Sequence, residues 1–239
     1  MMPLITVGPL RLSSYGLLLI GALMLWWGWS ERRIRVATQR EPDVLLLLMI
    51  VGAWVGGRLW YVAGSSAIGA QLFHLRALEF AWPGALAGAL VMLVVAQWRW
   101  QWSVTQIVSL IAVPSLIAQA IGALGMYVAG IGLGQPWGGI FAVDIAGALR
   151  HPVQLYEASV ALCGALVTHR LQLQYPHHAV QWFVGALAMN WLVVEGFRAQ
   201  SVMLPCGIHV PQLIGLVLFV SVVEQYLRAS ATVQRTATK

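Results

Sequence analysis

The stretch VTQIVSLIAVPSLIAQAIGALGMYVAGI, Val104–Ile131, decides the fold of this chain and contains no Asp, Glu, Lys, Arg or His. A helix needs about 20 apolar residues to cross the hydrocarbon core of a bilayer, so this stretch is long enough to span a membrane. Similar apolar stretches recur along the chain, and we expect spans near residues 13–29, 43–63, 80–97, 104–131, 153–169, 179–197 and 208–227. The sequence therefore predicts an all-α, polytopic membrane protein with about seven transmembrane helices.

The composition supports this prediction. Of 239 residues, 59% are hydrophobic and 9% are charged, whereas a soluble globular domain carries about 25% charged residues. This scarcity of charge excludes a water-soluble enzyme, an intrinsically disordered chain and a protein that binds nucleic acid. The net charge of +6 is instead a topology signal, because the cytoplasmic loops of membrane proteins are enriched in Lys and Arg.

The densest basic cluster gives the expected orientation. The segment Ser30–Pro42, which we predict to be a loop, contains four arginines: Arg32, Arg33, Arg35 and Arg40. By the positive-inside rule this loop is cytoplasmic, so the N-terminus lies outside and the C-terminus inside. We expect a single membrane-embedded domain over residues 1–228, a polar, disordered cytoplasmic tail over 229–239, and no cleavable signal peptide.

The sequence lacks several common catalytic signatures. Two cysteines cannot form a disulfide framework, and Cys163 lies in an apolar run whereas Cys206 lies in a short loop. No zinc-ligand spacing, P-loop, G-x-S-x-G motif or pair of aspartates is present. We therefore expect no metal site, and these absences argue against a metalloprotease, an ATPase, a serine hydrolase and an aspartyl protease.

Polar side chains near the outer ends of the expected spans are the functional candidates. An ionisable group deep in hydrocarbon costs about 2.5–3.5 kcal/mol, so it needs a partner, water or a function. The first candidate lies in Gly56-Gly57-Arg58-Leu59-Trp60-Tyr61, where the glycines let another helix or a lipid headgroup approach closely. Two interpretations of Arg58 stay open: it contacts a ligand, or it extends its guanidinium to the interface.

The second candidate is the octet Arg150–Glu157 at the start of the fifth expected span. His151, Gln154 and Glu157 follow one another at i, i+3 and i+6, close to one helix face, with Tyr156 beside them. His, Tyr and Glu can transfer protons. The same side chains can instead form interhelical hydrogen bonds that fix packing, and both interpretations stay open.

Two further candidates lie at the ends of other spans. Glu195 and Arg198 are three residues apart and can form an ion pair, and Ser13, Ser14 and Tyr15 form either part of a site or a helix cap. Three expected spans thus carry an arginine near the outer leaflet, and the planar donor fork of arginine suits phosphate. We therefore expect an outward-facing pocket for an anionic phospholipid headgroup.

The octet, R-H-P-V-Q-L-Y-E, closely resembles the R-H-P-x-Q-L-Y-E motif of bacterial prolipoprotein diacylglyceryl transferases. Other segments resemble that family in the same order along the chain. Tyr15-Gly16-Leu17 resembles its Y-G element, Gly56-Gly57-Arg58-Leu59 with Tyr61 resembles its G-G-R-x-G-Y, and Glu195-x-Phe197-Arg198 resembles its E-x-F-R. Seven spans and an outside N-terminus also agree with this family.

The resemblance implies transfer of a diacylglyceryl group from phosphatidylglycerol to the lipobox cysteine in the signal peptide of a prolipoprotein, with release of glycerol phosphate. It also implies a location in the bacterial cytoplasmic (inner) membrane and no cofactor. His151, Tyr156 and Glu157 would position or shuttle protons so that the cysteine thiolate, the reactive form, is generated. The implied substrate-binding residues, among which the arginines would hold phosphate, are Tyr15, Arg58, Arg150, Gln154, Glu195 and Arg198.

Three positions depart from the family pattern. Ala123 aligns with the arginine of the family's G-R-x-G-N-F-x-N element, Pro83 with the histidine of its S-F-H-G-G element, and Trp191 with an arginine four residues before the E-x-F-R glutamate. Two hypotheses therefore stay open: a divergent, active transferase, or an inactive relative that binds lipid or serves as a structural membrane subunit. A transporter is a weaker hypothesis, because the spans lack paired acidic residues and matching broken helices.

Overall fold

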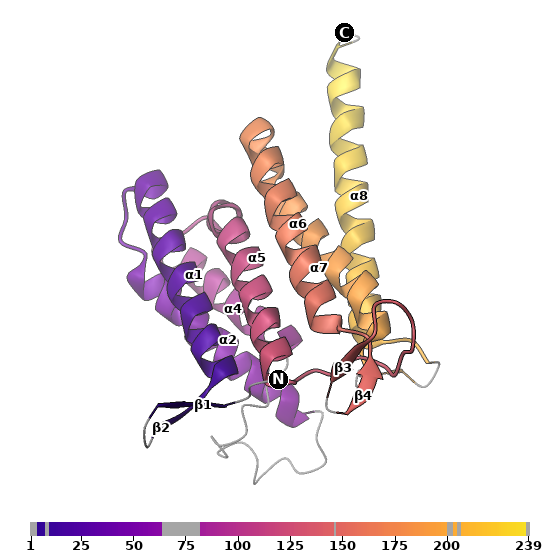
Figure 1. Ribbon diagram of the computed structural model, residues 1–239. Coiled ribbons are helices and arrows are strands. Elements are labelled where there is room, and N and C mark those ends of the chain that lie inside the picture. Colours follow the sequence, from indigo (N-terminus) through magenta and orange to yellow (C-terminus); the bar gives the residue numbers. More distant parts are fainter. Residues whose placement is uncertain are drawn as a thin grey trace. The chain divides into compact units, whose positions relative to one another are not determined.

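The computed structural model describes residues 4–7, 10–63, 82–145, 147–199, 203–204 and 207–237. This part of the chain is mostly helical, as the composition predicted, and each expected span coincides with one α-helix (Figure 1). The α-helices are α1 (Ser14–Thr38), α2 (Asp43–Ala63), α4 (Trp82–Trp100), α5 (Val104–Ala129), α6 (Val153–Gln174), α7 (Ala179–Val194) and α8 (Val210–Ala237).

Two short β-ribbons accompany the helices and were not predicted. Strand β1 (Leu4–Val7) pairs antiparallel with β2 (Leu10–Ser13), and β3 (Val143–Ile145) pairs antiparallel with β4 (Ala148–Arg150). Strands this short leave no readable alternation of polar and apolar residues. Short 3-10 helices lie at the two ends of α7: η1 (Pro176–His178) before it and η2 (Glu195–Phe197) after it.

The chain folds as two compact units. One comprises Met1–Gly28 and Ile111–Lys239, and the other comprises Trp29–Leu110. In the first unit α7 packs against α6 on one side and α8 on the other (Figure 1). In the second unit α2 packs against α4.

Four helical stretches in the described residues are long and apolar enough to cross a membrane. They are Asp43–Ala63, Val104–Ala129, Pro176–Phe197 and Val210–Arg228. The structure thus agrees with an all-α membrane protein that crosses the bilayer several times.

The predicted loop Ser30–Pro42 is wrong for most of its length, because α1 continues to Thr38. A side-chain ion pair one helical turn apart, Arg35 to Glu31 at 2.6 Å, stabilises this extension. Ile34 is fully buried and anchors the same turns. The helix ends at Thr38, and Gln39 directly after it has a φ of 57°, in the left-handed region.

The tail expected to be disordered over 229–239 is helical as far as the structure describes it, since α8 runs to Ala237. The last Gly or Pro before this end is Gly215. A stretch without helix breakers that includes several alanines and straight-chain residues retains helical backbone even where it becomes polar.

Glycines bring α2 and α4 into contact in the second unit. A Cβ on Gly52 would lie 2.7 Å from the carbonyl oxygen of Gly88, and one on Gly56 would lie 2.9 Å from the Cα of Gly88. A Cβ on Gly84 would lie 2.9 Å from the carbonyl carbon of Gly56. Both helices thus present glycines four residues apart, which lets their backbones touch.

Candidate active site

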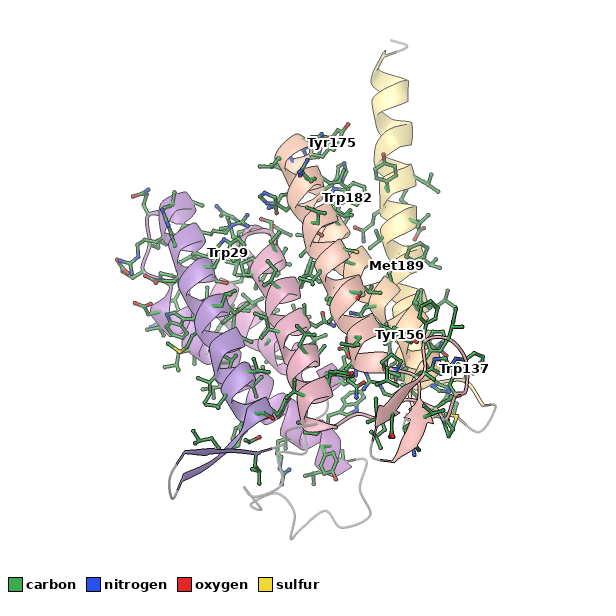
Figure 2. The ribbon with its side chains drawn as sticks, in the orientation of Figure 1. Trp29, Trp137, Tyr156, Tyr175, Trp182 and Met189 are labelled. Atoms are coloured by element: carbon green, nitrogen blue, oxygen red, sulfur yellow. The ribbon has the colours of Figure 1, made fainter. Side chains whose placement is uncertain are left out.

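Three backbone segments meet at the N-terminal end of α6, all within the first unit (Figure 2). Residues 133–137 lie between residues 149–151 and residues 197–199, and hydrogen bonds join the middle segment to both neighbours. These bonds run from Gln135 N to Phe197 O (2.8 Å), Ala199 N to Leu133 O (3.0 Å), His151 N to Gln135 O (3.1 Å) and Trp137 N to Leu149 O (3.0 Å). The pairing satisfies the backbone polar groups of an irregular loop and holds the octet beside η2.

Gln154 fastens the start of this loop to α6. Its side chain is fully buried, and its Nε2 donates to the carbonyl oxygens of Ile131 at 2.6 Å and Gly132 at 3.1 Å. The side-chain Oε1 is buried and has no partner among the described residues. The side-chain nitrogen of Gln154 therefore positions the loop, and its Oε1 is an acceptor that no described donor uses.

Arg198, Glu157 and Glu195 form an ion-paired triad next to the contact between Gln154 and Gly132. Arg198 Nη2 lies 2.9 Å from Glu157 Oε2, and Arg198 Nε lies 3.2 Å from Glu195 Oε2. The three side chains are 18%, 15% and 6% exposed, in the order Arg198, Glu157, Glu195. The predicted pairing of Glu195 with Arg198 is confirmed, and the second carboxylate makes the net charge of the triad −1.

A glycine makes room for the guanidinium. Gly132 has a φ of +71°, and a Cβ there would lie 3.2 Å from Arg198 Nη1. A side chain at this position would be strained and would crowd Arg198. The absence of a side chain at Gly132 thus lets the loop lie against the guanidinium of Arg198.

Two amides support Glu157. Gln119 Nε2, on α5, donates to Glu157 Oε1 at 3.4 Å, and Asn190 Nδ2, on α7, donates to the Glu157 backbone oxygen at 3.4 Å. Asn190 is 1% exposed. Since both carboxylate oxygens of Glu157 have donors, this side chain is held in one orientation.

The imidazole of His151 lies in an aromatic surround. Trp137 stacks on it with ring centroids 4.8 Å apart and an interplanar angle of 19°, and Phe197 lies at 4.9 Å with a tilt of 55°. His151 Nδ1 lies 3.3 Å from Tyr156 Oη. Trp137 and Tyr156 appear at the same end of α6 in Figure 2. The octet thus brings His151 and Tyr156 into hydrogen-bond contact.

Arg150 lies on the edge of this cluster. Its Nη1 donates to the Gly134 oxygen at 3.1 Å, and its Nε is buried without a partner. None of the ion pairs within the described ranges includes Arg150. Its guanidinium therefore carries a charge that no described carboxylate neutralises.

Tyr15 belongs to the same unit. Its ring packs against α5, since a Cβ on Gly125 would lie 3.3 Å from Tyr15 Cδ2. Ser13 is a helix cap, because its Oγ accepts the Gly16 N–H at 3.3 Å.

Arg58 lies in the second unit, on α2. It is 9% exposed, and its guanidinium carbon lies 5.8 Å from the centre of the Tyr61 ring. A buried guanidinium over an aromatic face is a cation–π arrangement. Arg58 thus belongs to a different compact unit from the candidates on α6 and η2.

The three departures from the family pattern are packing residues or helix ends. Ala123 is buried with Ala120, Ala158 and Ala161 between α5 and α6. Trp191 is 9% exposed on α7, and Pro83 lies in the first turn of α4. The side chain of Ala123 thus packs in an alanine cluster formed by α5 and α6.

Several residues of the site were not found from the sequence. Trp137, Phe197, Gln119, Asn190 and Gly132 contact His151, Glu157 or Arg198 from other elements. Gly134, Pro136, Gly138 and Gly139 around Trp137 are a composition typical of a loop, and the family resemblance included Phe197 in the E-x-F-R element. No sequence signal links Gln119 or Asn190 to Glu157.

Cys163 is free and exposed, and Cys206 lies outside the described residues. Within the described ranges, no three His, Cys, Asp or Glu side chains gather to hold a metal ion. The expectation of no metal site stays a prediction.

Comparison with known proteins gives a consistent result. A family model described as prolipoprotein diacylglyceryl transferase matches residues 3–227. The phosphatidylglycerol–prolipoprotein diacylglyceryl transferase of Cupriavidus necator is 30% identical over 172 residues, which cover 64% of this chain and 62%, less than two thirds, of that protein. Its namesake in Rhodospirillum centenum is 30% identical over 207 residues (80% of this chain, 74% of that one). The protein of the same name from Synechococcus elongatus is 28% identical over an alignment of 247 positions, which covers 90% of this chain and 82% of that protein.

Proposed function

Because the chain belongs to the prolipoprotein diacylglyceryl transferase family, we propose that it transfers the diacylglyceryl group of phosphatidylglycerol to the lipobox cysteine thiol of a prolipoprotein. The observation that carries this proposal is the meeting of the octet with the Glu195–Arg198 segment. There a histidine in contact with a tyrosine hydroxyl, an arginine without a carboxylate partner among the described residues, and a buried ion-paired triad share one end of α6.

The reaction displaces a phosphate oxygen from carbon. The cysteine sulfur attacks the glyceryl carbon that bears this oxygen, so the S–C bond forms as the C–O bond breaks. The electron pair leaves on the oxygen of glycerol phosphate. The thiol proton must be removed, because the thiolate is the nucleophile, and the developing negative charge on the phosphate must be stabilised.

His151 is the proton acceptor in this proposal. If Nδ1–H donates to Tyr156 Oη, across the 3.3 Å between them, Nε2 keeps a lone pair that can take the thiol proton. Tyr156 then fixes the tautomer. A positioned base of this kind contributes about 10²–10⁴-fold to a rate.

Arg150 is the phosphate ligand best supported within the first unit, since no described carboxylate neutralises it. Arg198 shares its charge with Glu157 and Glu195, so it stabilises the shape of the site and offers Nη1 to a ligand. Glu157 holds Arg198 in place. Tyr15, Arg58 and the free acceptor of Gln154 are the remaining substrate-binding residues of the proposal.

The membrane topology, the location and the partners are part of the same proposal. The chain is a multi-pass membrane protein, and we assign it seven spans, an outside N-terminus, a cytoplasmic C-terminus and a location in the bacterial inner membrane. Residues 1–228 form one transferase-like domain, and residues 229–239 a polar cytoplasmic segment. The partners are phosphatidylglycerol or another anionic phospholipid and the prolipoprotein signal peptide, without a cofactor or nucleic acid.

Reconstitution tests the proposal. The purified protein in nanodiscs that contain phosphatidylglycerol is incubated with a lipobox peptide, and the peptide is examined by mass spectrometry. We expect a thioether-linked diacylglyceryl peptide and an equal amount of glycerol phosphate. Folded protein that binds phosphatidylglycerol without forming product would contradict the proposal and support the inactive relative.

A further inference from the structure

The ring plane of His151, which lies just before α6, is set by three aromatic side chains: Trp137, Phe197 and Tyr156. Trp137 covers one face of the imidazole at 4.8 Å and is nearly parallel to it. Phe197 approaches at 4.9 Å from η2, and Tyr156 contributes its hydroxyl at 3.3 Å. Such contacts leave the ring few orientations.

Trp137 is itself held in place. Its backbone N donates to the Leu149 oxygen at 3.0 Å, and the preceding residue, Pro136, forms a β-bridge with Arg150. Gly139 supplies the space for the indole, because a Cβ there would overlap the indole Nε1 and lie 2.5 Å from Cε2. By contrast, a Cβ on Gly138 would meet nothing within 4 Å.

We propose that Trp137 is a positioning residue: its indole fixes the imidazole of His151 so that Nδ1 faces Tyr156 and Nε2 faces the substrate thiol. This inference rests on the proposed function for its catalytic consequence. Catalysis by a base depends on its direction as well as its identity, and a misplacement of about 1 Å can cost about 10²-fold in rate. A stacked indole provides direction without adding a charge.

A different role for Trp137 makes different predictions. An aromatic residue in a loop at headgroup depth can anchor the protein at the membrane interface, and Trp137 is 48% exposed. An anchor needs only an amphipathic ring at this depth. It does not require that ring to stack on His151 or that residue 139 be a glycine.

The experiment compares two adjacent glycine substitutions with two tryptophan substitutions. Gly139→Ala displaces the indole without removing it, and Gly138→Ala is its matched control. Trp137→Leu removes the aromatic ring, and Trp137→Phe restores an aromatic face. NMR of histidine-labelled protein reports the stacking directly, because ring protons above an indole face are shifted upfield, and His151→Gln assigns the signal.

We expect the upfield His151 signal in the wild type, Gly138→Ala and Trp137→Phe proteins, and its loss in Gly139→Ala and Trp137→Leu. In the transfer assay Gly139→Ala and Trp137→Leu should lose about tenfold or more in kcat with little change in KM for phosphatidylglycerol, as expected for a misdirected base. Trp137→Phe should recover most of the rate.

The inference is overturned if the His151 signal is unchanged in Trp137→Leu, or if Gly139→Ala matches Gly138→Ala in both signal and kcat. Because the NMR signal does not need turnover, it separates the two proposals. The expected signals without product in any variant would refute the transferase function and retain the stacking, whereas activity with an unchanged signal would refute the role of Trp137.

Discussion

The α2–α4 pair and the α6–η2 region pack helical backbone in opposite ways. Between α2 and α4, glycines bring the two backbones into contact, so packing depends on the absence of side chains. Between α6 and η2, Glu157, Arg198 and Glu195 fill the space with charged side chains that form ion pairs with one another. The first arrangement fails when a methyl group is added, and the second fails when a partner is removed.

Removing Arg198 should have the largest effect. Arg198→Ala leaves Glu157 and Glu195 buried without their cation, and losing one partner of a buried ion pair costs about 3–5 kcal/mol. We expect a loss of this size in the free energy of unfolding, measured with denaturant in detergent, and loss of transfer activity.

The control for this change is Arg228→Ala. Arg228 pairs with Glu224 on the exposed surface of α8, where the side chains are 78% and 56% exposed, and exposed pairs contribute little. Equal stability of the Arg198→Ala and Arg228→Ala proteins would contradict the account of the triad.

Adding a methyl group at Gly88 should have the next largest effect. A Cβ there would overlap the Gly52 carbonyl, with the carbonyl carbon at 2.7 Å, and overpacking of a tight contact costs about 1–3 kcal/mol. Gly88→Ala should therefore lower the thermal midpoint of unfolding.

Gly21→Ala is the matched change on α1, where a Cβ would meet nothing within 4 Å. Alanine is the better helix former by about 0.8–1.0 kcal/mol, so this variant should be as stable as the wild type or more so. The α2–α4 contact would have to be looser than described if the two substitutions shifted the midpoint in the same direction.

Gln119→Leu should have the smallest effect. It removes the donor to Glu157 Oε1, and a typical hydrogen bond contributes about 0.5–1.5 kcal/mol. We expect a decrease of this size in stability and a few-fold slower transfer. Gln106→Leu, at an exposed position of α5, should change neither, and an equal response of the two variants would exclude Gln119 as a support of Glu157.

The contrast also shows what a sequence can reveal. The Gly56-Gly57 pair and an acid three residues before an arginine are local patterns: the first was expected to let a helix or a headgroup approach, the second to form an ion pair, and the structure contains a helix contact at Gly56 and the Glu195–Arg198 pair. The pair Glu157–Arg198 joins residues 41 positions apart, and the Gln119 contact spans 38. Such distances depend on how helices are packed, which single-sequence spacing does not encode.

Other differences between the sequence predictions and the structure have local causes. The basic segment after residue 30 was expected to be a loop because it is charged, yet Glu31 and Arg35 are spaced to support a helix. The Gly- and Pro-rich composition around Trp137 is typical of a loop, whereas the stacking of its indole on His151 depends on the space left by Gly139. Composition indicates where a residue lies more readily than what it touches.

The most direct test of the central claim is the initial rate of thioether formation by the His151→Gln protein relative to wild type, with His177→Gln, an exposed histidine in η1, as the control. We expect His151→Gln to lose about 10²–10⁴-fold, the usual contribution of a positioned base, and His177→Gln to retain the wild-type rate. A His151→Gln protein that forms the thioether as fast as wild type would contradict the claim that His151 takes the thiol proton.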